Sequence, residues 1–142
     1  MEGISKGRRP MYYHKVQYYE TDKMGITHHS NYVRWMEEAR IDFMEKLGYG
    51  YDRLEAEGII SPVVSLSCDY KKSTTYPDVI GIEVKVVEFK GLKLMLEYNM
   101  TNQAGDQVFT ATSTHCFLNE NGRIIRISKD KPEFYEAINK GN

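Results

Sequence analysis

The chain has 142 residues, of which 41% are hydrophobic and 27% charged, and its formal net charge is −1. These values fit one compact domain with a single hydrophobic core. A net charge so close to zero gives the whole molecule no electrostatic preference for nucleic acid or for an anionic membrane. No apolar run in the sequence approaches the roughly 20 residues of a membrane-spanning helix.

The first ten residues are polar and basic and lack the apolar segment of a secretory signal. We interpret residues 1–10 as a flexible tail and residues 1–142 as one domain. Cys68 and Cys116 lie far apart, which favours free thiols over a disulfide, and together with the missing signal segment they predict a cytoplasmic protein.

The N-terminal third predicts a strand, a loop and a long helix. Residues 12–19 are rich in Tyr and Val, which favours a strand. Residues 20–28 have neither helical nor strand period. From His29 the apolar positions recur every three or four residues, which predicts a helix that Ser30 or Asn31 caps and that Gly48 and Gly50 end. Its predicted apolar stripe comprises Tyr32, Met36, Ala39, Phe43 and Leu47.

The remainder of the chain alternates between apolar and polar residues, as strands do. We expect strands at about 64–70, 80–86, 92–98 and 108–118, a short helix at 51–57 and a last helix at 132–138. Short turns join successive strands, so the sheet is predicted to be antiparallel. This order indicates an α+β fold, a curved sheet around a single helix. One helix cannot cover every apolar strand face, so we also expect a homo-oligomer, a dimer or a tetramer.

The loop before the helix holds a spaced set of residues. Asp22 is followed by Gly25 three positions later, by His29 seven positions later, and by the pair Asn31-Tyr32. This spacing resembles the signature of the 4-hydroxybenzoyl-CoA thioesterase-like branch of the hotdog superfamily. The order of elements also resembles the hotdog fold, a five-stranded antiparallel sheet wrapped around one long helix.

The resemblance implies an acyl-CoA thioesterase, which hydrolyses an acyl-CoA thioester to a free acid and CoA. It also implies that the backbone N–H of His29 polarises the thioester carbonyl. The chemistry is consistent, because a thiolate is a good leaving group and a carboxylate can attack the carbonyl or activate water. Asp22 supplies that carboxylate, and Gly25 allows a tight turn beside the ligand. We therefore take Asp22, His29 and Gly25 as the candidate catalytic residues.

Several readings of this loop stay open. Asp22 could be a nucleophile or a general base, and it could also only cap a turn. His29 could act through its ring or only through its backbone, and His28 stands where the family more often has an aromatic residue. The two adjacent histidines do not have the spacing of a metal site, so we expect no metal. We expect Glu38 to pair with Arg34 or Arg40 on the helix surface.

Substrate contacts are expected at both ends of the substrate. The phosphates of CoA need cations, and basic residues gather at Lys71-Lys72 and at Arg123 and Arg126. Ser65 and Ser67 share one strand face and could hold the acyl group or a water. We add Asn31 and Tyr32, at the head of the helix, to the predicted substrate-binding set.

Two other functions remain possible on the same fold. One is a non-catalytic module that binds acyl-CoA or an acyl carrier protein, for which a carboxylate beside the thioester would be superfluous. The other is a 3-hydroxyacyl dehydratase, which would use Asp22 and His29 to move protons. The sequence holds no GxSxG, GxxxxGK[ST] or GxGxxG motif. We therefore expect no serine-hydrolase elbow and no cofactor, only an acyl-CoA substrate.

Overall fold

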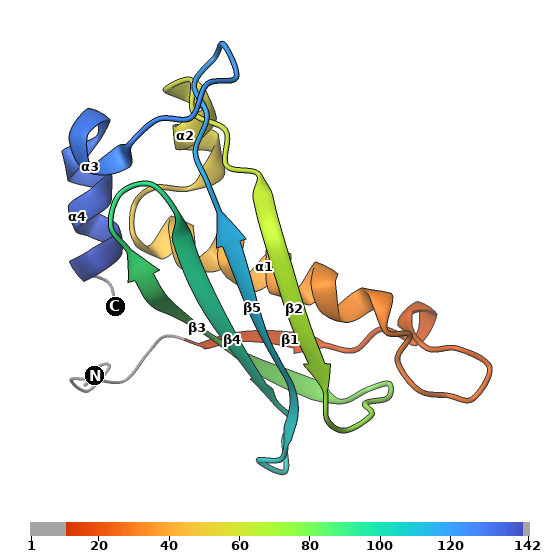
Figure 1. Cartoon of the computed structure of the whole chain (residues 1–142). Helices are drawn as coiled ribbons and strands as arrows, with labels where there is room; N and C mark the ends of the chain where they lie inside the picture. The colour runs from red at the N-terminus through yellow and green to blue at the C-terminus, as the bar shows by residue number, and fades with distance from the viewer. Residues whose placement is uncertain (1–10, 141–142) are drawn as a thin grey trace. The chain divides into compact units, whose positions relative to one another are not determined.

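The computed structural model describes residues 11–140, and the tail predicted for residues 1–10 lies outside them. The five strands form one antiparallel sheet in the order β1-β3-β4-β5-β2, which confirms the predicted α+β class (Figure 1). The elements in chain order are β1 (Met11–Lys15), the 3-10 helix η1 (Tyr18–Glu20), α1 (Ser30–Lys46), α2 (Tyr51–Ala56), β2 (Val63–Tyr70), β3 (Val79–Phe89), β4 (Leu94–Thr101), β5 (Gln107–His115), α3 (Ile127–Asp130) and α4 (Pro132–Lys140).

The chain forms two compact units. The first holds residues 11–40 with Cys68–Val84 and Tyr98–Ala111, and the second holds Ile41–Ser67, Lys85–Glu97 and residues 112–140. Helix α1 and strands β2 to β5 each continue from one unit into the other. That the chain is a single domain stays a prediction.

Helix α1 follows the apolar period that the sequence predicts. Four of the five stripe residues are buried, and Leu47 is half-buried. Gly48, which adopts a φ of +85°, follows just after the helix ends, as expected. The helix also buries Trp35, which is fully enclosed, and Arg40, whose guanidinium donates to the Tyr98 hydroxyl at 3.0 Å. A buried charge needs such a partner.

In the first unit, β1 pairs antiparallel with the beginning of β3, and His14 lies opposite Ile80 (Figure 1). The predicted alternation holds in β3, where Ile80, Ile82 and Val84 are buried. Beside them in sheet order, β4 buries Tyr98 and Met100. These residues form the apolar face of the sheet in this unit.

The first strand is shorter than predicted, and β2 has an exposed apolar face. The strand predicted to reach residue 19 ends at Lys15, because the Glu20 carboxylate accepts the Gln17 N–H at 2.8 Å and closes a 3-10 turn. Strand β2 forms as expected, but its apolar face is not covered. Val64, Leu66 and Tyr70 are 51%, 42% and 50% exposed, and β2 is also an edge strand of the sheet.

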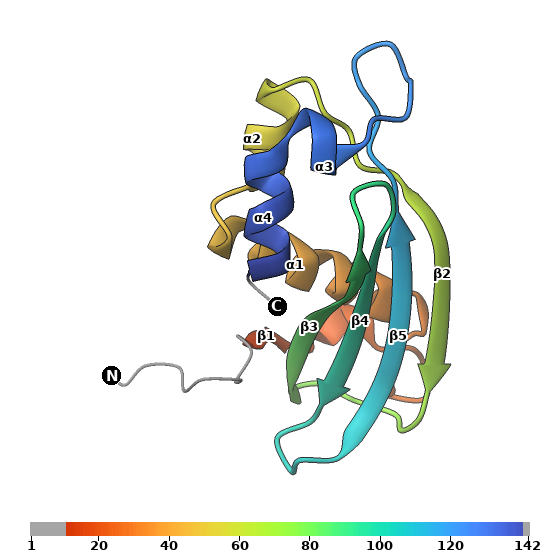
Figure 2. The ribbon, with the colours of Figure 1, turned by 60° about the vertical axis from the view of Figure 1, so that its left-hand side comes forward.

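In the second unit, α2 and α4 lie side by side (Figure 2). Arg53 of α2 lies 3.7 Å from the Glu133 carboxylate, and the Tyr49 and Phe134 rings are 4.9 Å apart. Both helices were expected from the sequence, whereas α3 was not. Along the described chain, no helix combines the length and hydropathy needed to cross a membrane.

Candidate active site

The segment between η1 and α1 folds back on itself as a short two-stranded loop (Figure 1). Thr21 and Thr27 form an antiparallel bridge, and the Asp22 N–H donates to the Ile26 carbonyl at 2.9 Å. At the end of the loop beyond this hydrogen bond, Gly25 turns the chain with a φ of +79°, a value that favours glycine. The loop containing Asp22 is therefore ordered by its own backbone.

Asp22 is exposed at the end of this ladder. Its Oδ1 accepts the Met24 N–H at 2.8 Å, so the side chain does cap a turn, one of the roles the sequence left open. None of residues 11–140 donates a hydrogen bond to its Oδ2. The capping role thus uses one carboxylate oxygen, and the other remains accessible.

Helix α1 begins immediately after His29, which is exposed. No residue of the described chain accepts the His29 backbone N–H, as expected at a helix N-terminus. Neither Ser30 nor Asn31 is the N-cap as predicted, because both lie within the helix. The His28 ring takes this role instead, since its Nδ1 accepts the Ser30 N–H at 3.2 Å.

Asn31 and Tyr32 are both buried, with 7% and 3% exposed. The Asn31 amide donates to the carbonyls of Glu20 and His28, at 3.1 and 3.2 Å. The Tyr32 hydroxyl lies 3.0 Å from the Thr74 hydroxyl, and burial raises the pKa of Tyr32. These contacts give both residues a structural role, and their contact with substrate stays a prediction.

The segment before β3 holds the loop from its other side. The Thr27 N–H donates to the Thr74 carbonyl at 2.8 Å, and the two hydroxyls are 2.6 Å apart. The Thr75 hydroxyl donates to the Gly25 carbonyl at 2.6 Å. The loop is therefore attached at Gly25 and at Thr27 to the segment that connects β2 and β3.

A partly buried polar group lies beneath η1, which we call the His14 cluster: His14, Glu20, Trp35 and Glu38. The His14 ring nitrogens each lie 2.9 Å from a carboxylate oxygen, Nε2 from Glu20 and Nδ1 from Glu38. The Trp35 indole donates to the other Glu20 oxygen at 3.0 Å. The expected pairing of Glu38 with Arg34 or Arg40 is wrong, because Glu38 faces β1 and accepts hydrogen bonds from there.

Glu20 is a carboxylate in this cluster. Burial raises the pKa of Glu20, but hydrogen bonds from the Gln17 N–H, His14 and Trp35 together outweigh burial and hold it below its usual value of 4.5. The cluster escaped the sequence analysis because its members come from three elements. One signal was present: Trp35 and Glu38, three residues apart, share a helix face.

An aromatic surface adjoins His29. The Tyr70 hydroxyl donates to the His29 carbonyl at 3.1 Å, and the rings of His28 and His29 lie 4.3 Å apart. The Tyr70 ring meets the His29 ring edge-on at 6.3 Å. Tyr70 is half exposed, so this face is open to a ligand.

The lysine, arginine and serine residues predicted to contact the substrate are exposed, but they belong to two different units. Lys72 is paired with Asp106 at 2.8 Å, whereas Lys71 beside it has no ion pair among the described residues. Lys71 belongs to the same unit as Asp22. Four further candidates belong to the second unit: Ser65, Ser67, Arg123 and Arg126.

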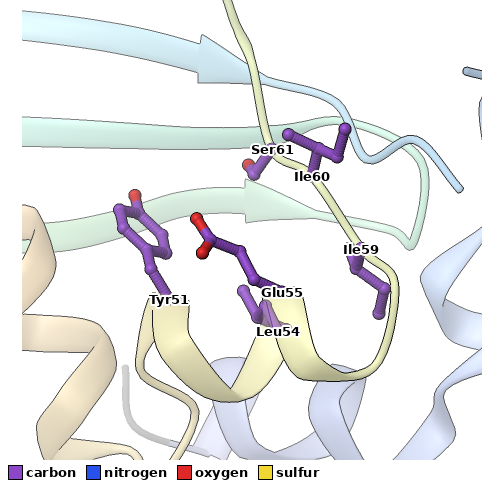
Figure 3. Close-up of a pocket in the computed structure, with 6 residues that line it drawn as sticks. All are labelled: Tyr51, Leu54, Glu55, Ile59, Ile60 and Ser61. Atoms are coloured by element: carbon purple, nitrogen blue, oxygen red, sulfur yellow. The ribbon is translucent and has the colours of Figure 1, made fainter. Parts of the chain in front are cut away.

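Within residues 11–140, no group of three or more His, Cys, Asp or Glu side chains could hold a metal ion. A small pocket in the second unit is lined by Tyr51, Leu54, Glu55, Ile59, Ile60 and Ser61 (Figure 3). None of the predicted site residues lines it.

The sequence matches the model of the thioesterase-like superfamily over residues 16–140, and the chain belongs to this family. This confirms the resemblance and the predicted enzyme class, thioester hydrolase. A relative from Bacillus subtilis, provisionally named acyl-CoA thioesterase YneP, is 35% identical over 89% of this chain and 92% of its own length.

Solved structures agree with this assignment. A DHNA-CoA thioesterase from Staphylococcus aureus is 35% identical, with a TM-score of 0.86 over 92% of this chain and 88% of its own. A gentisyl-coenzyme A thioesterase is 26% identical, with a TM-score of 0.78 over 84% and 97% of the two chains. The hotdog fold expected from the sequence is thereby confirmed.

Proposed function

We propose that this protein is an acyl-CoA thioesterase in which Asp22 acts as nucleophile or general base. The observation that carries the proposal is that one ordered loop bears an exposed carboxylate and leads directly into the N-terminus of α1. A carboxylate can attack the thioester carbonyl or remove a proton from water, and the CoA thiolate then leaves.

His29 supplies the second part of the proposed mechanism. Its backbone N–H stands at the N-terminus of a 17-residue helix, where the helix dipole favours negative charge. A carbonyl oxygen that accepts this N–H would be stabilised as negative charge develops on it. The hydrogen bond from Tyr70 to the His29 carbonyl supports this role, because it fixes the peptide at the helix start.

The acyl group that we propose is aromatic. The His28, His29 and Tyr70 rings give the helix start an accessible aromatic face, on which a planar acyl group can stack. Two of the related structures bear the names of aromatic acyl-CoA thioesterases, DHNA-CoA and gentisyl-CoA. For the CoA phosphates we propose Lys71, because it is exposed and lacks an ion pair among the described residues.

We also propose that two copies associate through β2 and that this protein acts in the cytoplasm. An edge strand with exposed Val64 and Leu66 can pair with its symmetry mate in an isologous dimer. Asp22 is exposed in one chain, whereas catalysis benefits from a site that excludes water. A measurement of the native mass distinguishes such a dimer from a tetramer of two dimers.

The experiment is a hydrolysis assay over a panel of acyl-CoA thioesters, with free thiol as the readout. We expect turnover, with aromatic acyl-CoA substrates preferred over aliphatic ones. Tight binding of several thioesters without thiol release would instead indicate a binding module. Hydration of an enoyl-CoA without thiol release would indicate a dehydratase.

A further inference from the structure

His14 is held between two carboxylates from different elements. It lies on β1, Glu20 ends η1, and Glu38 lies on α1. The side chains of His14 and Glu20 are only 11% and 6% exposed, and the Trp35 ring lies 4.6 Å from the His14 ring. Such a histidine is shielded from water and depends on its protein partners.

The two contacts require two donors from the imidazole. Each ring nitrogen lies 2.9 Å from a carboxylate oxygen, and a carboxylate can only accept. A neutral imidazole carries one N–H, so its second nitrogen would turn a lone pair toward an oxygen. The protonated ring satisfies both contacts, and it also offsets two negative charges.

The other groups that lie near His14 do not change the number of donors that its ring must supply. The Tyr12 hydroxyl, from the same strand, donates to the Glu38 oxygen that His14 approaches, at 2.9 Å. The Gln17 N–H and the Trp35 indole both donate to Glu20. The residue paired with His14 on β3 is Ile80, which is apolar. Glu20 and Glu38 are therefore the charged partners in contact with this ring among the described residues.

The cluster is connected to the catalytic loop through Glu20. Its side chain is held by His14, and its backbone carbonyl accepts the His28 N–H at 2.8 Å and the Asn31 amide. Glu20 lies two residues before Asp22, and His28 lies one residue before His29. A shift of Glu20 would therefore displace both proposed catalytic groups.

We propose that His14 is a positioning residue for the thioesterase site, and that its protonated ring fixes Glu20 and thereby the Asp22 loop on α1. This inference rests on the proposed function. Loss of one of the two ring contacts weakens the hold on Glu20 and releases the loop. Hydrolysis then falls by about tenfold, as expected for a displacement well short of unfolding.

Glu38→Gln is the decisive variant. The amide introduced at this position can donate to a neutral His14 at Nδ1 while Nε2–H still donates to Glu20, so both contacts survive deprotonation. We expect kcat/KM of E38Q to match wild type where the His14 ring carries its proton and to exceed it by several-fold where the ring is neutral, so the two pH profiles differ in shape. Glu37→Gln, on the neighbouring exposed position of the same helix, is the matched control and keeps the wild-type profile.

Trp35 supplies a readout that does not depend on activity. It is the sole tryptophan of the chain and stacks on His14, and a protonated imidazole quenches indole fluorescence. Wild type should show a fluorescence step on deprotonation. This step should shift in E38Q, stay in place in E37Q and vanish in His14→Gln. The His14→Gln variant should also lose about tenfold in kcat at every pH.

The outcomes separate the two proposals. The positioning role is overturned if E38Q and wild type share one alkaline profile, or if the fluorescence step is absent or unmoved in E38Q. If wild type releases no thiol from any acyl-CoA, the proposed function fails and the positioning role fails with it. A fluorescence step that moves in E38Q would then still report the two-carboxylate contact of His14.

Discussion

Glu20 and His28 are joined by a backbone hydrogen bond of 2.8 Å, from the His28 N–H to the Glu20 carbonyl. This bond aligns the end of η1 with the residue just before His29. The Glu20 side chain is held in turn by His14 and Trp35. One residue therefore connects the partly buried polar cluster to the loop that bears Asp22.

Replacing Asn31 by Ala removes two hydrogen bonds that reinforce this alignment. We expect the free energy of unfolding to fall by about 1–2 kcal/mol, because the buried Glu20 carbonyl and the partly buried His28 carbonyl each lose one donor. kcat/KM should fall several-fold as well. Chemical denaturation and the thiol-release assay measure the two effects. Asn121→Ala, in an exposed turn, is the control, and an N31A variant that behaved like it would contradict the assignment.

Gly25→Ala tests whether the loop turn serves activity as well as folding. A Cβ at Gly25 meets no atom within 4 Å, but the φ of +79° is unfavourable for alanine, with a cost of roughly 1–2 kcal/mol. Gly105 has a φ of +88° and equally open surroundings in the turn after β4, so G105A is a matched control. Both variants should lose similar stability, and only G25A should lose activity. Equal losses of activity would argue against a site at Gly25.

Glu20 should make stability dependent on pH in the acid range. Its folded pKa lies below the ordinary value of 4.5, so its contribution is complete above pH 4.5 and is lost as pH falls through the folded pKa. Glu20→Gln should therefore lower the free energy of unfolding at neutral pH. It should also reduce the fall of this free energy as the pH decreases. Denaturation midpoints measured between about pH 2 and 7 test the prediction. Denaturation midpoints that fall as steeply with decreasing pH in E20Q as in wild type would refute it.

Leu66→Glu should dissociate the proposed dimer. Leu66 is 42% exposed on the edge strand β2, and a carboxylate there would face its own symmetry mate. Sedimentation velocity should report half the wild-type mass. Ile124→Glu, at a residue 62% exposed outside the sheet, should leave the mass unchanged. An L66E protein of wild-type mass would exclude this strand as the interface.

Periodicity predicted most of the fold, because burial follows it closely in α1 and β3. It was less informative at η1, where a hydrogen bond from Gln17 to Glu20 ends a run of residues that otherwise favours a strand. Periodicity also predicted an apolar face on β2 but could not say what covers it, because an apolar alternation looks the same whether its cover comes from the same chain or from another molecule.

The candidate site was partly accessible from sequence. The spacing of Asp22, Gly25 and His29 identified the loop, since all three lie on one continuous segment. The His14 cluster was not found, because β1, η1 and α1 meet only after folding. Glu38 shows the limit clearly: local spacing favoured a partner on its own helix, and its observed partners are Tyr12 and His14 on β1.

The most direct test of the central claim is kcat/KM of Asp22→Asn for an acyl-CoA thioester that wild type hydrolyses. The Asn oxygen can still accept the Met24 N–H, so the loop turn is preserved while the carboxylate is lost. We expect a loss of at least about 100-fold with an unchanged denaturation midpoint. Asp52→Asn, at an exposed aspartate of α2, should keep full activity. Near-wild-type hydrolysis by D22N would contradict the account.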